Sequence, residues 1–307
     1  MINLKHSFLR GSYPPLVTPL RNREVDYDTY ASLVERQIRE GSHGIVVNGT
    51  TGEPSTLTVQ ERNRLVETAV NAARGRIPVV AATGSHSHAE SIELTLGAQK
   101  AGAAAVLVVT PYFIRPPQRG LVEYYLDVGR RTDLPLLLYH IPGRAAVDLK
   151  AETIAQIAES LPTLVGIKHA ANDLGLVTAL LTKLGADFRV FVGLEELSFP
   201  MLAVGASGLM NAVGNLVPRR IADLYQAVAR GDLEQARRLH DSLFELNQAI
   251  FFDSNPIPIK YMMMRMGLLP TEEHRLPLVN ATAELAERLD GVLRRAGLLE
   301  GKTKSLE

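Results

Sequence analysis

The side chain with the clearest capacity for covalent chemistry is Lys168. It closes the apolar run 164–167, and it is one of only eight lysines against 25 arginines. At the end of a buried strand it would stand in a partly desolvated cavity, which disfavours the ammonium form. The resulting neutral amine can form a Schiff base with a carbonyl group. The other interpretation is a lysine that reaches solvent or pairs with an acid such as Asp173.

Tyr139 ends the preceding apolar run, 136–138, so its hydroxyl is predicted to reach the same place as Lys168. Making and breaking a carbinolamine requires a group that both gives and takes a proton. A hydrogen-bonded phenol can do this. Without Lys168 beside it, Tyr139 would fit equally well as an aromatic side chain that lines the interior.

Two further segments are suited to bind carboxylates. The sequence Gly-Thr-Thr-Gly-Glu at 49–53 has glycines that let backbone amides converge, while the hydroxyls of Thr50 and Thr51 donate. Many turns between a strand and a helix look like this, so the motif is weak by itself. Arg144 lies in a Pro-Gly turn and has the geometry to bind a second carboxylate through two hydrogen bonds, although a surface arginine is the commoner case.

The histidines do not form a metal-binding pattern. His86 and His88 are two residues apart, and His140 and His169 directly follow the tyrosine and the lysine described above. No His-x3-His pair with an added acid occurs, and cysteine is absent, so we expect neither a metal site nor a disulfide. The methionines at 262–266 are expected to pack a helix rather than to form a binding groove.

Short apolar runs alternate with longer amphipathic stretches along the first two thirds of the chain. Helical periodicity is clear at 27–40 and 59–73, between runs that are apolar on both faces. Strands of that kind, separated by helices, favour a parallel sheet, and eight of them favour a closed (β/α)8 barrel over an open doubly wound sheet. The eight predicted strands are 13–18, 44–48, 78–82, 104–110, 135–139, 164–168, 189–192 and 208–212.

The remaining residues are predicted to be helical. Asn255-Pro256 is typical of a helix N-cap followed by proline at the first helical position. We therefore expect an α/β barrel that carries the active site over 1–215, a C-terminal helical extension packed on it over 216–300, and a frayed tail over 301–307. The predicted helices of the extension are 219–230, 233–252, 256–266 and 281–296.

Composition narrows the class of protein. Of the 307 residues, 46% are hydrophobic and 21% charged, as in an average globular protein. Lys+Arg and Asp+Glu both number 33, so there is no basic excess for nucleic acid or an anionic membrane. No apolar run approaches the ~20 residues that span a bilayer, and the N-terminus has no signal-peptide pattern. We expect a cytoplasmic protein whose partners are small molecules.

With these residues in hand, the chain resembles the dihydrodipicolinate synthase/N-acetylneuraminate lyase family of class I, Schiff-base pyruvate lyases. The resemblance covers nearly the whole chain and is closer to the synthase branch, because of the double threonine and Arg144. The segments that carry it are Thr18-Pro19, the Gly-Thr-Thr-Gly-Glu turn, Thr110-Pro111-Tyr112, Tyr139-His140-Ile141-Pro142-Gly143-Arg144, Gly166-Ile167-Lys168, the Asn-Pro-Ile-Pro-Ile-Lys of 255–260 and Arg275-Leu276-Pro277.

The resemblance implies a role for each candidate residue. Lys168 would form an imine with C2 of pyruvate, without a cofactor, and Tyr139 would shuttle protons together with Thr50. Arg144 would bind the carboxylate of an aldehyde such as aspartate semialdehyde. Family members are commonly homotetramers, built as dimers of dimers. Thr50 and Thr51 would hold the pyruvate carboxylate. The other implied substrate-binding residues are Gly49 in the same turn, Gly193 and Met210 beside the lysine, Tyr112, and Phe113 at the position of the second relay tyrosine.

The sequence departs from the synthase pattern at four positions. Phe113 stands where a second tyrosine normally enters the neighbouring subunit's site, and His169 stands where an acid is common. Pro54 and His86 replace polar residues that resemble a lysine-binding cleft, so we expect no feedback inhibition by L-lysine.

Three alternatives to the synthase remain open. The first is a catabolic aldolase that cleaves 4-hydroxy-2-oxo acids, for example 2,4-dihydroxyhept-2-ene-1,7-dioate to pyruvate and succinate semialdehyde. The second is a keto-acid-binding protein without turnover. The third is an unrelated barrel isomerase or phosphate binder, which the lack of a glycine-rich loop between strands seven and eight disfavours.

Overall fold

Eight parallel strands form a closed barrel in the computed structural model, which describes residues 1–299. The strands are ordered β1-β10-β9-β8-β7-β6-β5-β4, and β1 pairs with β10. The remaining gap closes between the first and second strands, where Leu16 donates to the Val46 carbonyl at 3.0 Å and Val46 donates to the Pro14 carbonyl at 3.0 Å. The predicted (β/α)8 barrel is confirmed.

The first strand is shorter than the predicted 13–18. Pro14 and Pro15 have no N–H to donate, so regular pairing ends at Ser12 and only an isolated bridge from Pro15 to Val46 follows. The last strand is also shorter than the predicted 208–212, since it ends at Leu209 and a 3-10 turn begins at Ala212. The other six strands lie where the apolar runs predicted them. The strand bounds are β1 Gly11–Ser12, β4 Ile45–Val47, β5 Val79–Ala82, β6 Ala105–Val109, β7 Leu136–His140, β8 Leu164–His169, β9 Arg189–Val192 and β10 Gly208–Leu209.

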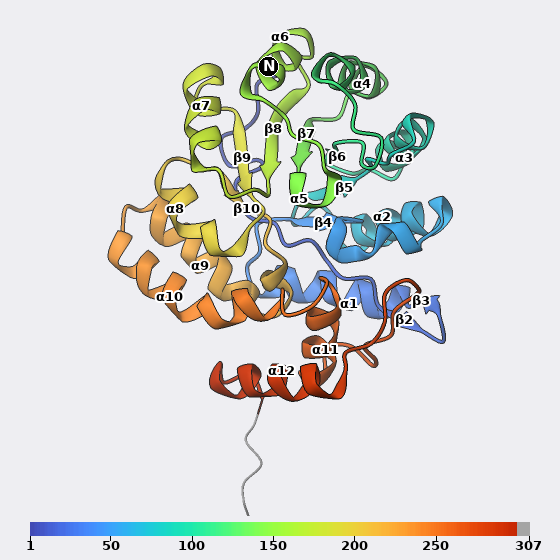
Figure 1. Cartoon of the computed structure of the whole chain (residues 1–307), viewed down its shortest axis with the longest axis vertical. Coiled ribbons are helices and arrows are strands. Elements are labelled where there is room, and N and C mark those ends of the chain that lie inside the picture. Colours follow the sequence, from blue (N-terminus) through green and yellow to red (C-terminus); the bar gives the residue numbers. More distant parts are fainter. Residues whose placement is uncertain (300–307) are drawn as a thin grey trace, which may run out of the picture.

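Helices surround the strands in the order expected for alternating units (Figure 1). The two predicted helices, 27–40 and 59–73, are confirmed as α1 and α2, and α2 begins with a capping box between Thr58 and Glu61. The bounds are α1 Tyr27–Arg39, α2 Val59–Ala73, α3 His88–Lys100, α4 Gln118–Arg130, α5 Pro142–Ala145, α6 Ala151–Ser160, α7 Leu174–Leu184, α8 Ser198–Ala203 and α9 Pro218–Ala229.

The C-terminal helices are α10 Leu233–Ala249, α11 Ile257–Arg265 and α12 Ala283–Arg295, and they lie below the barrel in Figure 1. The prediction that Asn255 caps α11 was wrong. Pro256 occupies the N-cap position, and the Asn255 amide instead donates to Thr51 in the barrel. Met262 and Met263 are fully buried, so the methionines do pack a helix. The predicted tail 301–307 lies outside the described residues.

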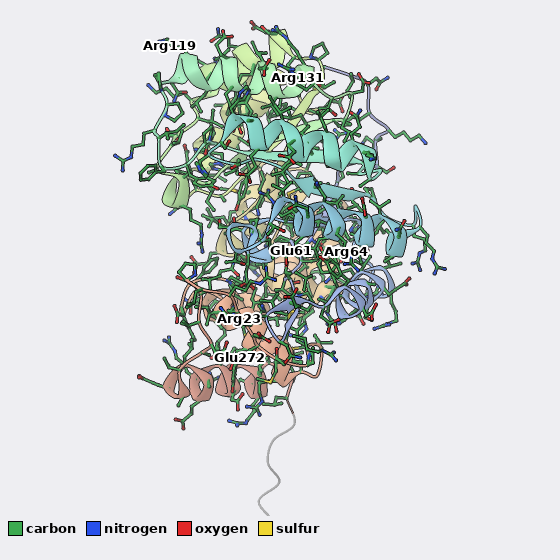
Figure 2. All side chains as sticks on the ribbon, turned by 90° about the vertical axis from the view of Figure 1, so that its right-hand side faces the viewer. Arg23, Glu61, Arg64, Arg119, Arg131 and Glu272 are labelled. Atoms are coloured by element: carbon green, nitrogen blue, oxygen red, sulfur yellow. The ribbon has the colours of Figure 1, made fainter. Side chains whose placement is uncertain are left out.

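A hairpin near the N-terminus joins the barrel to the segment that precedes α12. Its strands are β2 Leu20–Arg21 and β3 Glu24–Val25. At its turn, the Arg23 amide donates to Glu273 at 2.5 Å, and Arg275 donates to the Arg23 carbonyl at 2.8 Å. Figure 2 shows Arg23 beside Glu272 on this side of the molecule. The extension is thus attached to the barrel through polar contacts as well as apolar packing.

The barrel interior is a separate apolar cluster from the layer between strands and helices. It is filled by side chains such as Val46, Leu107, Leu137 and Phe191. This cluster extends up to Tyr139. The buried Arg189, at the start of β9, lies at the opposite end of the strands from Lys168. Within residues 1–299, no helix combines the length and apolar character that crossing a bilayer requires.

Candidate active site

Lys168 and Tyr139 are direct partners in the register of β8 and β7. Because alternate residues of a strand point to opposite faces, both side chains enter the barrel from adjacent strands. The Lys168 ammonium nitrogen lies 4.4 Å from the centre of the Tyr139 ring, and the lysine is only 4% exposed. The carboxylate of Asp173 is used elsewhere, since it caps α7 by accepting from Leu176 at 3.0 Å.

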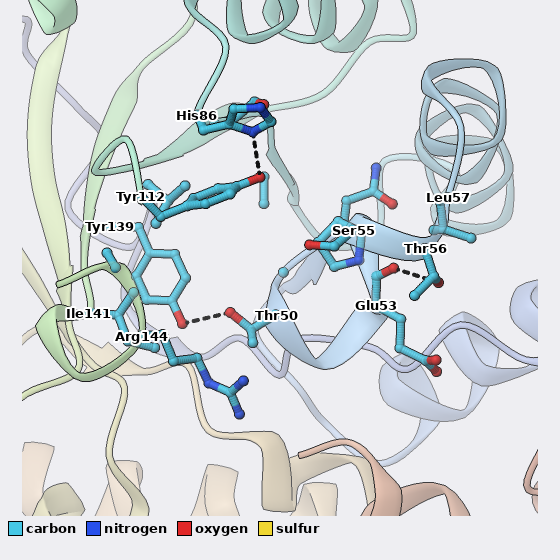
Figure 3. A pocket seen from close by; sticks show the side chains of 18 of the residues that line it. Thr50, Glu53, Ser55, Thr56, Leu57, His86, Tyr112, Tyr139, Ile141 and Arg144 are labelled. Atoms are coloured by element: carbon cyan, nitrogen blue, oxygen red, sulfur yellow. Dashed lines mark hydrogen bonds between the residues drawn. The ribbon is translucent and has the colours of Figure 1, made fainter. Parts of the chain in front are cut away.

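The Tyr139 hydroxyl forms a hydrogen bond of 3.1 Å with the Thr50 hydroxyl, and Figure 3 shows the two groups facing each other. Thr50 begins the 3-10 turn Thr50–Gly52 that follows β4, and Gly49 precedes it in an extended conformation. The sequence-predicted turn is therefore brought to the phenol. A proton has a continuous path between the two hydroxyls.

Of the two residues expected beside the lysine, Gly193 lies against it and Met210 lies in the barrel interior. A Cβ atom added at Gly193 would lie 2.8 Å from Cε of Lys168, so only glycine leaves room for the lysine stem. Met210 is 1% exposed and belongs to the same interior cluster as Tyr139.

A cavity of about 600 Å³ opens beside Tyr139. It is lined by Gly49, Thr50, Tyr112 and Arg144 and extends to His86, whose ring nitrogen lies 3.4 Å from the Tyr112 hydroxyl (Figure 3). A space of this size accommodates a small keto acid together with a second substrate.

Five predicted site residues are not part of the wall of this cavity, namely Lys168, Gly193, Met210, Thr51 and Phe113. The Lys168 nitrogen lies 4.4 Å from the centre of the Tyr139 ring, and Tyr139 does line the cavity. Thr51 is buried behind it, 2% exposed. Phe113 points to solvent, with its side chain 89% exposed and its backbone in the left-handed region at φ +75°.

A buried ion cluster that the sequence reasoning missed supports the turn from behind. Lys260 donates to Glu53 at 2.7 Å, and His274 lies 3.1 Å from the other carboxylate oxygen. All three side chains are at most 1% exposed. Burial lowers the pKa of Lys260, while the Glu53 carboxylate acts in the opposite direction. The sequence did contain one sign of this ion cluster, because Lys260 is the single charged residue in the apolar stretch 256–264.

Asn255 also supports the turn, through a hydrogen bond to Thr51. Its amide nitrogen donates to the Thr51 oxygen at 3.1 Å, so the hydroxyl proton of Thr51 remains free to be donated elsewhere. On the opposite side, Thr18 donates to the Gly52 carbonyl at 2.7 Å. The turn is thereby fixed by residues more than 30 positions before it and more than 200 after it.

Glu195 is a second buried carboxyl group that the sequence reasoning did not single out. It is 2% exposed, and one oxygen accepts from the Ala212 amide at 2.6 Å, whereas the other has no hydrogen-bond partner among residues 1–299. Burial raises its pKa to about 7, and the nearby Lys168 charge acts in the opposite direction. It is therefore a group that can hold a proton near the lysine at neutral pH.

The histidines have partners of their own. His88 lies 3.0 Å from Asp127, and His140 and His169 contact each other. Across residues 1–299, no three side chains of His, Asp or Glu converge in a way that would hold a metal ion.

An amine beside a phenol that is hydrogen-bonded to a Gly-Thr-Thr-Gly turn, all at the C-terminal mouth of a (β/α)8 barrel, fits the chemistry of a Schiff-base lyase. Comparison with known proteins agrees. The family model of the dihydrodipicolinate synthetase family matches residues 8–296, and the chain belongs to this family. The enzymes of this family are class I, pyruvate-dependent lyases, and this chain is one of them.

Individual relatives cover nearly the whole chain. The 4-hydroxy-tetrahydrodipicolinate synthase of Thermus thermophilus is 44% identical over 94% of this chain and 97% of its own length. That of Thermodesulfovibrio yellowstonii is 41% identical over 95% of this chain and 99% of its own. The crystal structure of dihydrodipicolinate synthase from Aquifex aeolicus superimposes with a TM-score of 0.93 at 36% identity, covering 95% of this chain and all of the other.

Proposed function

We propose that this enzyme joins pyruvate to aspartate semialdehyde, as a 4-hydroxy-tetrahydrodipicolinate synthase. One observation carries the proposal. Lys168 and Tyr139 are register partners at the ends of β8 and β7, and the Tyr139 hydroxyl is hydrogen-bonded to Thr50, so an amine and a proton relay lie next to each other. The names of the relatives, at 41–44% identity, support the synthase over other lyases of the family.

In this mechanism the Lys168 amine attacks C2 of pyruvate. The carbonyl oxygen takes up protons through Tyr139 and leaves as water, and a protonated imine remains. The imine withdraws electrons as C3 loses a proton, which gives an enamine. No separate cofactor is needed, because the lysine itself supplies the electron sink. The backbone amides and hydroxyls of the turn 49–53 bind the pyruvate carboxylate.

The enamine carbon then attacks the aldehyde of the second substrate, and a new carbon–carbon bond forms. Tyr139 and Thr50 deliver the proton that the aldehyde oxygen requires. Arg144 lines the same cavity and binds the carboxylate of the aldehyde. The amino group of the second substrate then attacks C2 of the imine, which closes the ring and breaks the bond to the Lys168 nitrogen, so the free amine is restored.

We test this function by trapping. Pyruvate and borohydride should add one reduced pyruvyl group, located by peptide mass spectrometry at Lys168. Lys168→Ala should abolish the adduct, and Tyr139→Phe should form it about 10²–10⁴ times more slowly, the usual worth of a positioned acid–base group. Lys183→Ala, an exposed lysine on α7, is the matched control. No adduct at neutral pH would refute the mechanism.

Cleavage of 4-hydroxy-2-oxo acids is a second candidate, favoured by one observation. Phe113 has no hydroxyl to complete a relay from a neighbouring subunit. The same lysine and tyrosine would serve the reverse reaction. Comparison of kcat/KM for aspartate semialdehyde addition and for oxo-acid cleavage decides between them, and an adduct without any turnover would identify a binding protein.

We also propose that the enzyme is a homotetramer, a dimer of dimers. The loop after β6 exposes two adjacent apolar side chains, Phe113 at 89% and Ile114 at 58%. Burial of such a pair against a second copy would stabilise the assembly. Sedimentation velocity should give a mass four times that of the chain, and a monomer at micromolar concentration would contradict the proposal.

A further inference from the structure

A pair of buried histidines lies directly behind the catalytic strand ends. His140 and His169 occupy the register position next to Tyr139 and Lys168 on the same two strands, so they point to the outer face of the barrel. Both are at most 2% exposed. Their ring planes are within 15° of parallel, the ring centres are 5.2 Å apart, and the two Nδ1 atoms are 3.0 Å apart, so the rings meet edge to edge.

Each ring has one further contact. His169 Nε2 lies 2.9 Å from the Asp173 carbonyl oxygen, and His140 Nε2 lies 2.7 Å from the Asp148 carboxylate. A carbonyl oxygen only accepts, so His169 Nε2 must carry a proton. The Nδ1–Nδ1 contact needs one proton between its two atoms. The Asp148 contact needs a third, on His140 Nε2.

Two neutral imidazoles supply only two ring protons. All three contacts are hydrogen bonds only when the pair carries one extra proton and a single positive charge. With two protons, a bare lone pair of His140 faces the Asp148 carboxylate and the contact is repulsive. The hydrogen-bond geometry therefore depends on the protonation of the pair.

The Asp148 contact closes the loop that carries Arg144. The chain leaves β7 at His140, passes through α5 with Arg144, and returns at Asp148 to the same histidine. Gln118 on α4 holds the other side of this return, because its amide donates to the Asp148 carbonyl at 2.7 Å. The contact between His140 and the Asp148 carboxylate depends on pH, whereas the contact between Gln118 and the Asp148 carbonyl does not.

We propose that His140 and His169 are positioning residues that together bind one extra proton. This third ring proton makes the hydrogen bond to Asp148 that fixes the Arg144 loop to the barrel. When the proton is lost, the hydrogen bond breaks and the loop becomes more mobile. The affinity for the carboxylate of the second substrate then depends on pH. This inference rests on the proposed function for the role of Arg144, but the protonation of the pair can be measured without it.

The direction of the effect follows from the surroundings of the pair. Burial lowers the pKa of both imidazoles, and His140 lowers that of His169 further, while the carboxylates of Asp148 and Asp173 act in the opposite direction. Val192 on β9, beside His169, is apolar. The third proton is therefore bound below the ordinary histidine value of about 6.5 and is lost as the pH rises.

The kinetic test measures KM for aspartate semialdehyde between about pH 5 and 8. In the natural protein KM should rise about two- to tenfold with pH, the worth of one hydrogen bond. In Asp148→Asn the amide can donate to the bare His140 nitrogen, so KM should be low and independent of pH. Gln118→Ala, the matched control, should raise KM by a constant factor and keep the pH dependence.

Nitrogen NMR of the histidine rings tests the pair directly, without turnover. We expect three protonated ring nitrogens on the acid side and two on the alkaline side. Two at every pH, a flat KM profile in the natural protein, or a pH dependence retained in Asp148→Asn would each overturn the proposal. Failure of the borohydride trapping would instead refute the proposed lyase mechanism and leave the proton count standing.

Discussion

The two sides of the active-site mouth are built in different ways. On one side, Lys168 and Tyr139 stand at the ends of adjacent strands, and their placement follows from strand register. On the other side, Thr50 and Thr51 lie in a short 3-10 turn, which is held by Asn255, Lys260 and other residues of the C-terminal extension. A strand end is positioned by its own sheet, whereas a turn needs outside support.

Each side also buries one carboxyl group, and the two differ in their partners. Glu53, behind the turn, is paired with the Lys260 ammonium and contacts His274. Glu195, on the lysine side, accepts from the Ala212 amide through one oxygen, and its other oxygen has no hydrogen-bond partner in the described part of the chain. Equal burial thus leads to an ion pair in one case and to a proton-holding acid in the other.

The largest expected effect is on the turn side. Lys260→Met should leave Glu53 buried and unpaired and lower the free energy of unfolding by about 3–5 kcal/mol, measured by urea denaturation. Adding Glu53→Gln should restore most of this loss, because the uncompensated charge is then gone. Lys183→Met, which removes an exposed ion pair on α7, should change stability by less than about 1 kcal/mol. Equal losses in the two lysine variants would break the comparison.

The lysine side should show the second largest effect, and it depends on pH. Because the pKa of Glu195 is raised to about 7 from an ordinary 4.5, the carboxyl contributes stability that is complete below pH 4.5 and is lost as the pH rises to 7. The loss is on the order of 3 kcal/mol, since each unit is worth about 1.4 kcal/mol.

Glu195→Gln cannot titrate, so its stability relative to the natural protein should improve steadily between pH 4.5 and 7 and stay constant above that. Urea denaturation of both proteins at four pH values measures this difference. A difference that does not change with pH would mean that Glu195 is already ionised beside Lys168, and that the two carboxyl groups are alike.

A third effect, on activity rather than on stability, concerns the hydroxyls of the relay. If the synthase reaction needs a hydroxyl at position 113, Phe113→Tyr should raise kcat/KM for pyruvate plus aspartate semialdehyde by about 10²–10⁴, the usual worth of a positioned acid–base group. Cleavage of 4-hydroxy-2-oxo acids should rise less. Strong synthase activity that the substitution leaves unchanged would show that Tyr139 and Thr50 suffice.

The smallest effect is expected from L-lysine. Pro54, directly after the turn, has neither a hydroxyl nor an amide hydrogen to donate, and His86 already contacts Tyr112 in the same cavity. Arg62 there is paired with Glu90 at 3.1 Å. Millimolar L-lysine should therefore leave the initial rate unchanged. Inhibition below about 1 mM that neither substrate competes with would contradict this prediction.

Sequence reasoning predicted the lysine side well and the turn side only in part. The apolar runs before Tyr139 and Lys168 indicated two strands, and parallel strands of one barrel end at one face. The glycines and threonines of 49–53 indicated a carboxylate-binding turn. The residues of the turn itself do not indicate what holds it; the single charge of Lys260 in the apolar stretch 256–264 was the one sign elsewhere in the sequence. The expectation that Asn255 caps a helix rested on the adjacent proline, which fits that pattern, and it was wrong.

The sequence alone determined the barrel, the order of its units and the set of side chains at its mouth, because strand and helix periodicities and the position at a strand end are local properties. Only the tertiary structure decided which of these side chains touch. The contacts of Glu53 with Lys260 and His274 span more than 200 residues of sequence. The contact between His140 and His169 depends on the register of β7 and β8. Packing brings such groups together, and packing is set by the shape of the whole core rather than by any one segment.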